Sequence, residues 1–278
     1  MIVVTGAKGI IGRAVVAQLL TEGIEVKEIS RDIFDLSNEN NLTSLISQRP
    51  DAVVHLAAAV PHSLHYPDTD TSAELTRRID CCVFDAARAW NCRIVYASTC
   101  SLYDKRSEDT MFEDLPILVR PDSPYIKAKS QGEALFAKMS SYAVMRVPAP
   151  IGPGLPTSVV ARRFFDLASA AQPIRLWGSG KREQNYVDVR DIADVMIKAA
   201  FSNAKGVFNI AADAPTAMLT LATTIVTVVG RGSVEFAGVA DPLEDEHARY
   251  SNKRARDLLC WRPKIALENS IRSMQEAK

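Results

Sequence analysis

Short runs rich in valine and isoleucine alternate along this chain with longer stretches in which apolar residues recur at helical spacing. This alternation is typical of βαβ units, in which parallel strands pair with one another beneath covering helices. We therefore predict an α/β fold, a doubly wound parallel sheet with helices on both faces. The runs that are short and apolar enough to be buried parallel strands are Ile2–Thr5, Glu25–Ser30, Ala52–His55, Arg93–Ala97 and Tyr142–Val147.

The predicted helices lie between these strands and beyond them. Residues 147–156 hold four prolines and two glycines, which is typical of a crossing between two domains. The final segment, 252–278, carries apolar residues such as Trp261 among its charges and is expected to dock on the rest of the protein. The expected helices are Ile10–Glu22, Ser72–Trp90, Tyr125–Ser140, Val159–Ala171, Val189–Phe201 and Leu219–Val229, and a strand is expected at Val207–Ala211.

Composition narrows the class of protein. The chain has 278 residues, 47% of them hydrophobic, which suits one large or two modest domains and excludes disorder, collagen and a small disulfide scaffold. Its 33 basic and 33 acidic residues leave no net charge, so a general nucleic-acid binder is not expected. No apolar run reaches the roughly 18 residues of a membrane span, and no signal peptide is visible. Five cysteines without zinc spacing predict neither a metal site nor a full disulfide set, and we expect a cytoplasmic protein with no membrane partner.

A glycine-rich turn follows the first strand and opens the first helix. Gly6 allows the tight turn, Gly9 lets the backbone approach a pyrophosphate, and Gly12 allows the helix to pack closely on the strand. The first backbone N–H groups of the helix, at Ile10 and Ile11, are free to face phosphates. The turn therefore predicts a Rossmann-type dinucleotide site.

The end of the second strand discriminates between the two nicotinamide cofactors. An acidic residue there binds the adenosine ribose of NAD, whereas a basic residue accommodates the 2′-phosphate of NADP. The strand ends here in Ser30 and Arg31, which favours NADP(H) over NAD because a guanidinium pairs well with phosphate. Asp32 follows directly and keeps NAD open.

Three further segments suggest proton and hydride chemistry. Tyr125 and Lys129 are four residues apart near the start of a helix, so they share one face, and an ammonium there favours the tyrosine phenolate. Thr99 follows a strand at its carboxyl end, where ligands bind in open α/β sheets. The small residues after His55, at 56–58 (Leu56, Ala57 and Ala58), would let a dinucleotide lie close to the backbone.

Taken together, these motifs and their order resemble the extended short-chain dehydrogenase/reductases, which include NAD(P)-dependent sugar-nucleotide epimerases, dehydratases and reductases. The resemblance extends over essentially the whole chain. The matching segments are Thr5–Gly12, Asp35-Leu36, His55–Ala58, Ser98–Tyr103, Tyr125–Lys129, Met145–Pro148, Asn185–Ala193, Gly206–Ile210 and Leu258–Lys264.

The resemblance implies roles for individual residues. Thr99 would be the hydroxyl of a catalytic triad, Tyr125 its acid/base and Lys129 the residue that tunes the tyrosine and contacts the ribose. Asp35 and Leu36 would contact the adenine, and Pro148 would lie beside the nicotinamide. It also implies a sugar-nucleotide substrate, and a homodimer formed through the helices Ser72–Trp90 and Tyr125–Ser140. We expect residues 1–150 to form the dinucleotide-binding domain, with 186–211 packing back on it, and 151–185 and 212–278 to form a small α/β substrate lobe.

Departures from the family pattern bear on the substrate. Cys100-Ser101 stands where the family's 4,6-dehydratases carry Asp-Glu, so dehydration is disfavoured. Residues that hold the nucleotide diphosphate in relatives correspond here to Thr76, Ala149 and Gln184, and Arg182 and Arg249 are nearby arginines that could replace them.

Several functions stay open from the sequence. Reduction of a 4-keto sugar nucleotide is favoured, and an NAD-dependent 4-epimerase is the alternative. The missing diphosphate contacts also allow a dehydrogenase of a carbonyl or alcohol without a nucleotide. A non-catalytic dinucleotide sensor is opposed by the intact Thr99, Tyr125 and Lys129.

Overall fold

A computed structural model describes residues 1–38, 42–46, 48–61, 68–118 and 123–276. Its centre is a six-stranded sheet in the order β10-β5-β4-β3-β1-β2, in which every neighbouring pair is parallel. This arrangement confirms the predicted α/β fold. The strands are β1 (Ile2–Thr5), β2 (Val26–Ile29), β3 (Ala52–His55), β4 (Arg93–Thr99), β5 (Tyr142–Val147) and β10 (Gly206–Asn209).

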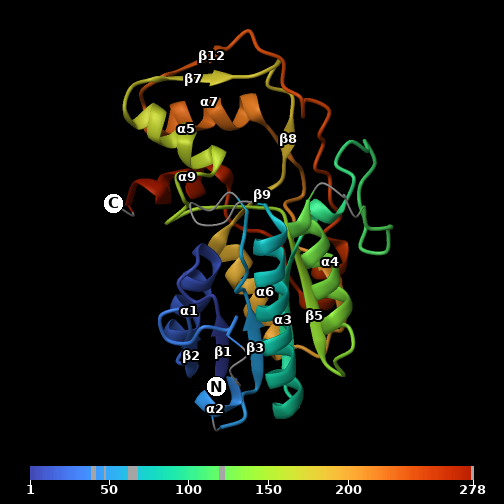
Figure 1. The fold of residues 1–278 in the computed structure, drawn as a ribbon. Coiled ribbons are helices and arrows are strands. Elements are labelled where there is room, and N and C mark those ends of the chain that lie inside the picture. The colour runs from blue at the N-terminus through green and yellow to red at the C-terminus, as the bar shows by residue number, and fades with distance from the viewer. Residues whose placement is uncertain (39–41, 47, 62–67, 119–122, 277–278) are drawn as a thin grey trace.

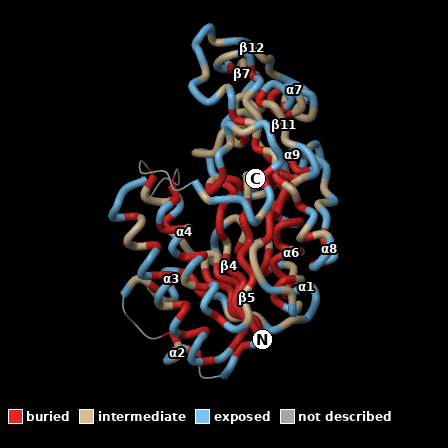
Figure 2. Tube along the Cα trace, turned by 90° about the vertical axis from the view of Figure 1, so that its right-hand side faces the viewer, coloured by how far each residue is buried: buried red, intermediate tan, exposed pale blue. Residues whose placement is uncertain are grey.

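Helices cover both faces of this sheet (Figure 1). Helices α1 (Ile10–Thr21) and α6 (Val189–Phe201) pack together on one face, and α3 (Asp70–Trp90) and α4 (Pro124–Phe136) on the other. Because successive side chains of a strand point to opposite faces, Val4 joins the core beneath α1 and α6 whereas Val3 joins the core beneath α3. The buried strands form the centre of the tube in Figure 2.

A second lobe with its own core stands at the carboxyl ends of the strands (Figure 1). It is built on α5 (Val160–Ser169), α7 (Met218–Val229) and α9 (Leu267–Glu276), with β7 (Pro173–Leu176) paired to β12 (Ser233–Phe236). The remaining elements are α2 (Leu42–Leu45), the 3₁₀ turn η1 (Cys100–Leu102), α8 (Lys253–Leu259), and the short pairs β6 (Ala149–Ile151) with β9 (Tyr186–Asp188) and β8 (Glu183–Gln184) with β11 (Thr216–Ala217).

The final segment docks as expected, but not on the second lobe alone. Trp261 is fully buried and its indole N–H donates to the backbone oxygen of Asp191, in the core beneath α1 and α6. Ile271 packs in the second lobe instead. The expected division of the chain into two domains stays a prediction, although the tail clearly contributes to both cores.

Local signals fix the helix that carries Tyr125. The Ser123 hydroxyl accepts a hydrogen bond from the Ile126 N–H, and Pro124 occupies the first turn, where its missing N–H costs nothing. The helix ends at Phe136, four residues earlier than the sequence predicts. In the described ranges, no helix is both long and apolar enough to cross a membrane.

Candidate active site

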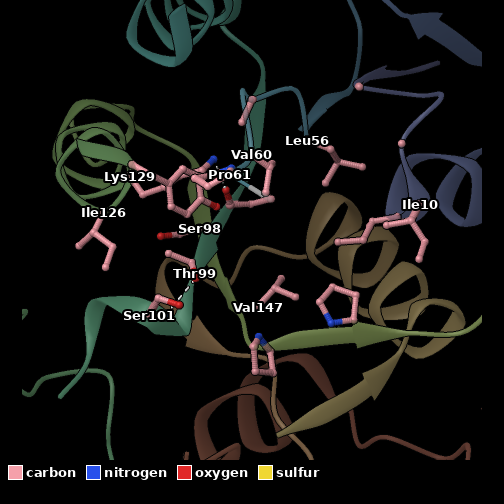
Figure 3. Close-up of a pocket in the computed structure, with 18 of the residues that line it drawn as sticks. Ile10, Leu56, Val60, Pro61, Ser98, Thr99, Ser101, Ile126, Lys129 and Val147 are labelled. Atoms are coloured by element: carbon pink, nitrogen blue, oxygen red, sulfur yellow. Dashed lines mark hydrogen bonds between the residues drawn. The ribbon is translucent and has the colours of Figure 1, made fainter. Parts of the chain in front are cut away.

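A cavity of about 470 Å³ opens at the carboxyl ends of the parallel strands (Figure 3). Ile10 and Leu56 lie on one side of it, and Ser98, Thr99 and Lys129 lie on the other. The predicted residues that line it are Gly6, Gly9, Ile10, Ile11, Gly12, Leu56, Ala58, Thr99, Tyr125, Lys129 and Pro148. The fold thus gathers most of the predicted cofactor and catalytic residues around one space.

The glycine turn fits a dinucleotide. Gly6 has a φ of +67°, and a Cβ added there would come within 2.8 Å of the Ala57 backbone nitrogen, so only glycine is tolerated. Ala57 therefore contacts the turn and does not line the cavity. Helix α1 has no side-chain cap, and the N–H groups of Ile10 and Ile11 at its start border the cavity. These are the donors that a pyrophosphate would satisfy.

The end of β2 carries a pair of opposite charges. The Lys8 ammonium, within the glycine turn, donates a hydrogen bond to the Asp32 carboxylate and lowers the pKa of Asp32 to about 2. Ser30 is buried at the strand end, and Arg31 is exposed beside it. Lys8 therefore offsets the charge of Asp32, the carboxylate that kept NAD open as a cofactor in the sequence analysis.

The two predicted adenine contacts lie on the loop after β2. The Asp35 carboxylate accepts hydrogen bonds from the backbone and hydroxyl of Ser37 and so shapes that loop. The side chain of Leu36 is buried with Ile29 and Leu42 in the core beneath α3. Neither residue lines the described cavity, and their contact with adenine stays a prediction.

The catalytic candidates lie on β4 and α4. Lys129 is 3% exposed, and its ammonium donates to the Ala97 carbonyl over 2.8 Å and stands 4.6 Å from the centroid of the Tyr96 ring. Thr99 ends β4, and its hydroxyl oxygen accepts from the Ser101 N–H at 3.1 Å (Figure 3). The hydroxyl proton of Thr99 is therefore available to a ligand in the cavity.

Electrostatics hold Tyr125 in its protonated form. Burial is the main cause that raises the pKa of Tyr125, and the negative charges of Asp80 and Asp68 raise it further. Burial lowers the pKa of Lys129, while Asp80 and Glu133 act against that change. The groups of the chain itself therefore favour the phenol; the phenolate predicted from the sequence also involves the positive charge of a bound nicotinamide, and it stays a prediction. A protonated phenol is suited to donating a proton to a carbonyl oxygen.

Asp68 is a site residue that the sequence did not indicate. Its carboxylate borders the cavity and accepts hydrogen bonds from the Ser123 hydroxyl (2.6 Å) and the Tyr125 N–H (2.8 Å). An anion at a helix N-terminus is favourable, so Asp68 fixes the start of α4. No spacing or motif marks this aspartate, because it approaches α4 only through the fold.

A buried ion pair holds α4 against the sheet. Arg146 on β5 donates two hydrogen bonds to Glu133 on α4, at 2.9 Å and 2.8 Å, and the Ser98 hydroxyl donates to the same carboxylate. Arg146 also donates to the Tyr103 hydroxyl at 2.6 Å. A bidentate pair of this kind fixes orientation, so it sets the position of Lys129 one turn away.

The two arginines proposed for a diphosphate lie away from this cavity. Arg182 borders a second cavity, of about 710 Å³, between α5, β7 and the start of α7, and its Nε lies 3.5 Å from the Asp241 carboxylate. Arg249 lies 3.5 Å from Glu183 and donates to the Glu108 carbonyl. Each cation already has an acidic neighbour.

A model of the NAD dependent epimerase/dehydratase family matches residues 2–211 of this chain. The chain belongs to the NAD dependent epimerase/dehydratase family. The matched range contains the glycine turn, Thr99, Tyr125 and Lys129, and of the predicted site residues only Arg249 lies outside it.

Two curated relatives are similar to this protein along most of its chain. A UDP-glucose 4-epimerase of Mycolicibacterium smegmatis is 27% identical over 301 residues, covering 96% of this chain and 95% of the relative. A GDP-6-deoxy-D-mannose reductase of Pseudomonas aeruginosa is 24% identical, covering 87% of this chain and 84% of the relative.

A solved structure confirms the family fold. The UDP-glucose 4-epimerase of Thermus thermophilus, in complex with NAD, superposes with a TM-score of 0.85 at 22% identity, covering 99% of this chain and 98% of that one. The family's architecture therefore extends through the second lobe as well.

Proposed function

We propose that this family member catalyses hydride transfer between NADP(H) and a carbonyl or hydroxyl carbon of a sugar nucleotide, with reduction of a 4-keto sugar as the favoured reaction. The observation that carries the proposal is that Thr99, Tyr125 and Lys129 line the same cavity as the glycine turn. A bound nicotinamide dinucleotide would supply or accept the hydride.

Residues of the chain would bind the cofactor, orient the substrate and transfer the proton. Gly9 and the N–H groups at the start of α1 would hold the pyrophosphate, and Pro148, which also lines the cavity, would lie beside the nicotinamide. Thr99 donates a hydrogen bond to the substrate oxygen and orients it. Tyr125 donates its phenolic proton to the carbonyl oxygen during reduction and takes it back during oxidation. Lys129 supports the phenolate that this step leaves and contacts the ribose.

The preference for NADP(H) rests on the end of β2. Lys8 is paired with Asp32, and Arg31 lies exposed one residue away. A 2′-phosphate placed there meets the positive charge of Arg31, while Lys8 offsets the Asp32 carboxylate that would repel it. NAD is the alternative cofactor, since the Thermus thermophilus relative was solved with NAD.

The reductase and epimerase forms of the proposal use the same catalytic residues. The relatives from Pseudomonas aeruginosa and Mycolicibacterium smegmatis represent one of each. The arginine at the end of β2 favours the reductase, because it suits an exchangeable NADP(H). An epimerase would instead retain its cofactor and regenerate it within each turnover.

One observation favours a second candidate, a dehydrogenase of a substrate without a nucleotide. Arg182 and Arg249 are each within 3.5 Å of an acidic side chain, so less of their charge is available to a diphosphate. Glu183 and Asp241 would have to be displaced or screened for a nucleotide sugar to bind there.

A homodimer formed through α3 and α4 is also part of the proposal. The outer faces of these helices meet along two shallow hollows that share Arg77 and Gln131. Light scattering after size exclusion measures the mass directly, and a single mass near the 30.4 kDa of one chain would contradict the dimer.

The test begins with cofactor analysis of the purified protein. Binding of NADP(H) and of NAD(H) is measured by fluorescence, and NADPH oxidation is followed with 4-keto derivatives of UDP-, dTDP- and GDP-sugars. We expect exchangeable NADP(H) and consumption of NADPH. Tightly retained NAD with interconversion of two nucleotide sugars would replace the reductase with the epimerase. Thermal stabilisation by none of UDP, dTDP, GDP and CDP would favour the substrate without a nucleotide.

A further inference from the structure

Behind the catalytic lysine lies a buried carboxylate with no place in the scheme above. Asp80, on α3, is 1% exposed. One of its oxygens lies 2.9 Å from His55 Nε2, and the other accepts from the Tyr96 hydroxyl at 3.0 Å. These contacts link α3 to β3 and β4 beneath the floor of the active site.

The hydrogen bonds around His55 fix its proton. The Thr5 hydroxyl oxygen accepts from the N–H groups of Leu56 and Ala57, so its own proton donates to His55 Nδ1, at 2.7 Å. Nδ1 is therefore the acceptor, and Nε2–H donates to Asp80. Burial lowers the pKa of His55, so the ring is neutral.

Asp80 therefore accepts from two neutral donors, one at each oxygen, which is the arrangement of an ionised carboxylate. Among the ion pairs of the described residues, none joins Asp80 to a lysine or an arginine. A buried charge without a compensating charge is costly, so a cation nearby must balance it.

Two buried cations of the described residues, Lys129 and Arg93, have no carboxylate partner. Arg93 lies at the start of β4, at the opposite end of the strand from the cavity, so Lys129 is the one near Asp80. Within the part of the chain that the structure describes, the Lys129 ammonium bonds the neutral Ala97 carbonyl and no carboxylate.

The Lys129 ammonium stands over the ring of Tyr96, the same residue whose hydroxyl binds Asp80. Glu133, the other buried carboxylate near it, is committed to the bidentate pair with Arg146. Asp80 and Lys129 are therefore two opposite charges, neither of them paired with another ion of opposite charge among the described residues, that both contact Tyr96.

We propose that Asp80 is a positioning residue that supplies the counter-charge of Lys129 and acts on it through Tyr96. It keeps the ammonium charged at the edge of the cavity although the Lys129 side chain is only 3% exposed. At the low effective dielectric of a buried site, such a charge acts over the width of one ring. Asp80 touches neither substrate nor cofactor.

The first test is a double-mutant cycle that needs no ligand. Asp80→Asn, Lys129→Met and the double variant are unfolded with urea. If the two charges balance each other, each single variant leaves one buried charge uncompensated, and the double variant removes both. We expect the unfolding equilibrium constant of the double variant to be about tenfold smaller than the two single effects multiplied together would give.

Asp85→Asn is the matched control, since Asp85 is an exposed aspartate on the same helix. In a variant that combines Asp85→Asn with Lys129→Met, the change in the unfolding equilibrium constant should equal the product of the two single changes. If the variant that combines Asp80→Asn with Lys129→Met shows the same simple product, the proposal is overturned. If the single variant Asp80→Asn does not fold, folding of the variant that combines it with Lys129→Met supports the proposal. If neither of these two variants folds, the proposal is contradicted.

The second test measures the pH dependence of turnover and rests on the proposed function. Removing a negative charge lowers the pKa of a neighbouring ammonium and of a neighbouring phenol alike. Asp80→Asn should therefore move the alkaline limb of the pH–rate profile for reduction to lower pH, by about one unit. The charged and titratable groups around Lys129 are Tyr125 and Glu133 on α4, Tyr96 on β4, Asp80 on α3 and His55 on β3. Beyond them, Arg146 on β5 is paired with Glu133, and Asp68 acts on Tyr125.

The two failures are distinguishable. A wild-type protein that binds no dinucleotide contradicts the proposed function and leaves the unfolding cycle to decide the role of Asp80. A working enzyme whose Asp80→Asn variant turns over more slowly with an unmoved profile shows a merely structural aspartate. Asp85→Asn should leave the profile in place.

Discussion

Gly132 on α4 faces Asp80 on α3 so closely that a Cβ at position 132 would come within 2.6 Å of the Asp80 carboxylate. The Tyr96 hydroxyl lies against the same point. The absent side chain is what lets Tyr96 bond Asp80 between two packed helices.

Gly132→Ala should therefore destabilise the protein, although alanine is the better helix former. We expect the free energy of unfolding to fall by about 1–3 kcal/mol, because neither helix can move freely in a packed core. Urea unfolding measures it. Adding Tyr96→Phe removes the nearest obstructing atom, so the double variant should regain part of the loss. A Gly132→Ala variant as stable as the wild type would show that the contact is loose.

Tyr125→Phe should abolish turnover while dinucleotide binding survives. The ring stays in the cavity, but the proton donor is gone, which costs about 10²–10⁴-fold in rate. Steady-state kinetics and fluorescence binding separate the two properties. Tyr142→Phe is the control, because Tyr142 begins β5 at the opposite end of the strand from the cavity. Full activity of Tyr125→Phe would remove this tyrosine from the mechanism.

Asp68→Asn should change the pH dependence of reduction. Reduction needs Tyr125 protonated, and the raised pKa of Tyr125 preserves that state through neutral pH. Activity is lost as the pH rises through this pKa. Removing the Asp68 charge lowers the pKa of Tyr125, so the alkaline decline should begin at lower pH. Profiles of NADPH oxidation test this, with Asp70→Asn, an exposed neighbour, as control. A decline that moves to higher pH would contradict the assignment.

Lys8→Ala and Arg31→Ala should each weaken NADPH binding and leave NADH binding nearly unchanged. A lost charge-assisted contact to the 2′-phosphate is worth about 1.5–3 kcal/mol, or about tenfold to a hundredfold in affinity. Titration calorimetry with both cofactors gives the ratio. Lys181→Ala, an exposed lysine of the second lobe, should have no effect on either. Equal losses for both cofactors would place these cations away from the 2′-phosphate.

Local rules explain how far the sequence alone determined the protein. Valine-rich runs, helical periodicity, a Ser-Pro helix start and glycines at fixed spacing act over a few residues, so they specified the parallel sheet, the helix of Tyr125 and the turn at Gly6. The same locality placed Tyr125 and Lys129 on one face.

The tertiary structure alone decided the charges around these residues. Asp68 and Asp80 come from segments outside α4, and no motif marks them, because their proximity to Tyr125 and Lys129 arises only when α3, α4 and the sheet pack together. Glu133 lies on α4 itself, but its pairing with Arg146 also depends on that packing. For the same reason, the sequence did not show that Arg182 and Arg249, the two candidates for contacting a diphosphate, lie beside Asp241 and Glu183. Sequence spacing fixed which groups the protein has for its chemistry, and three-dimensional packing fixed their protonation and their partners.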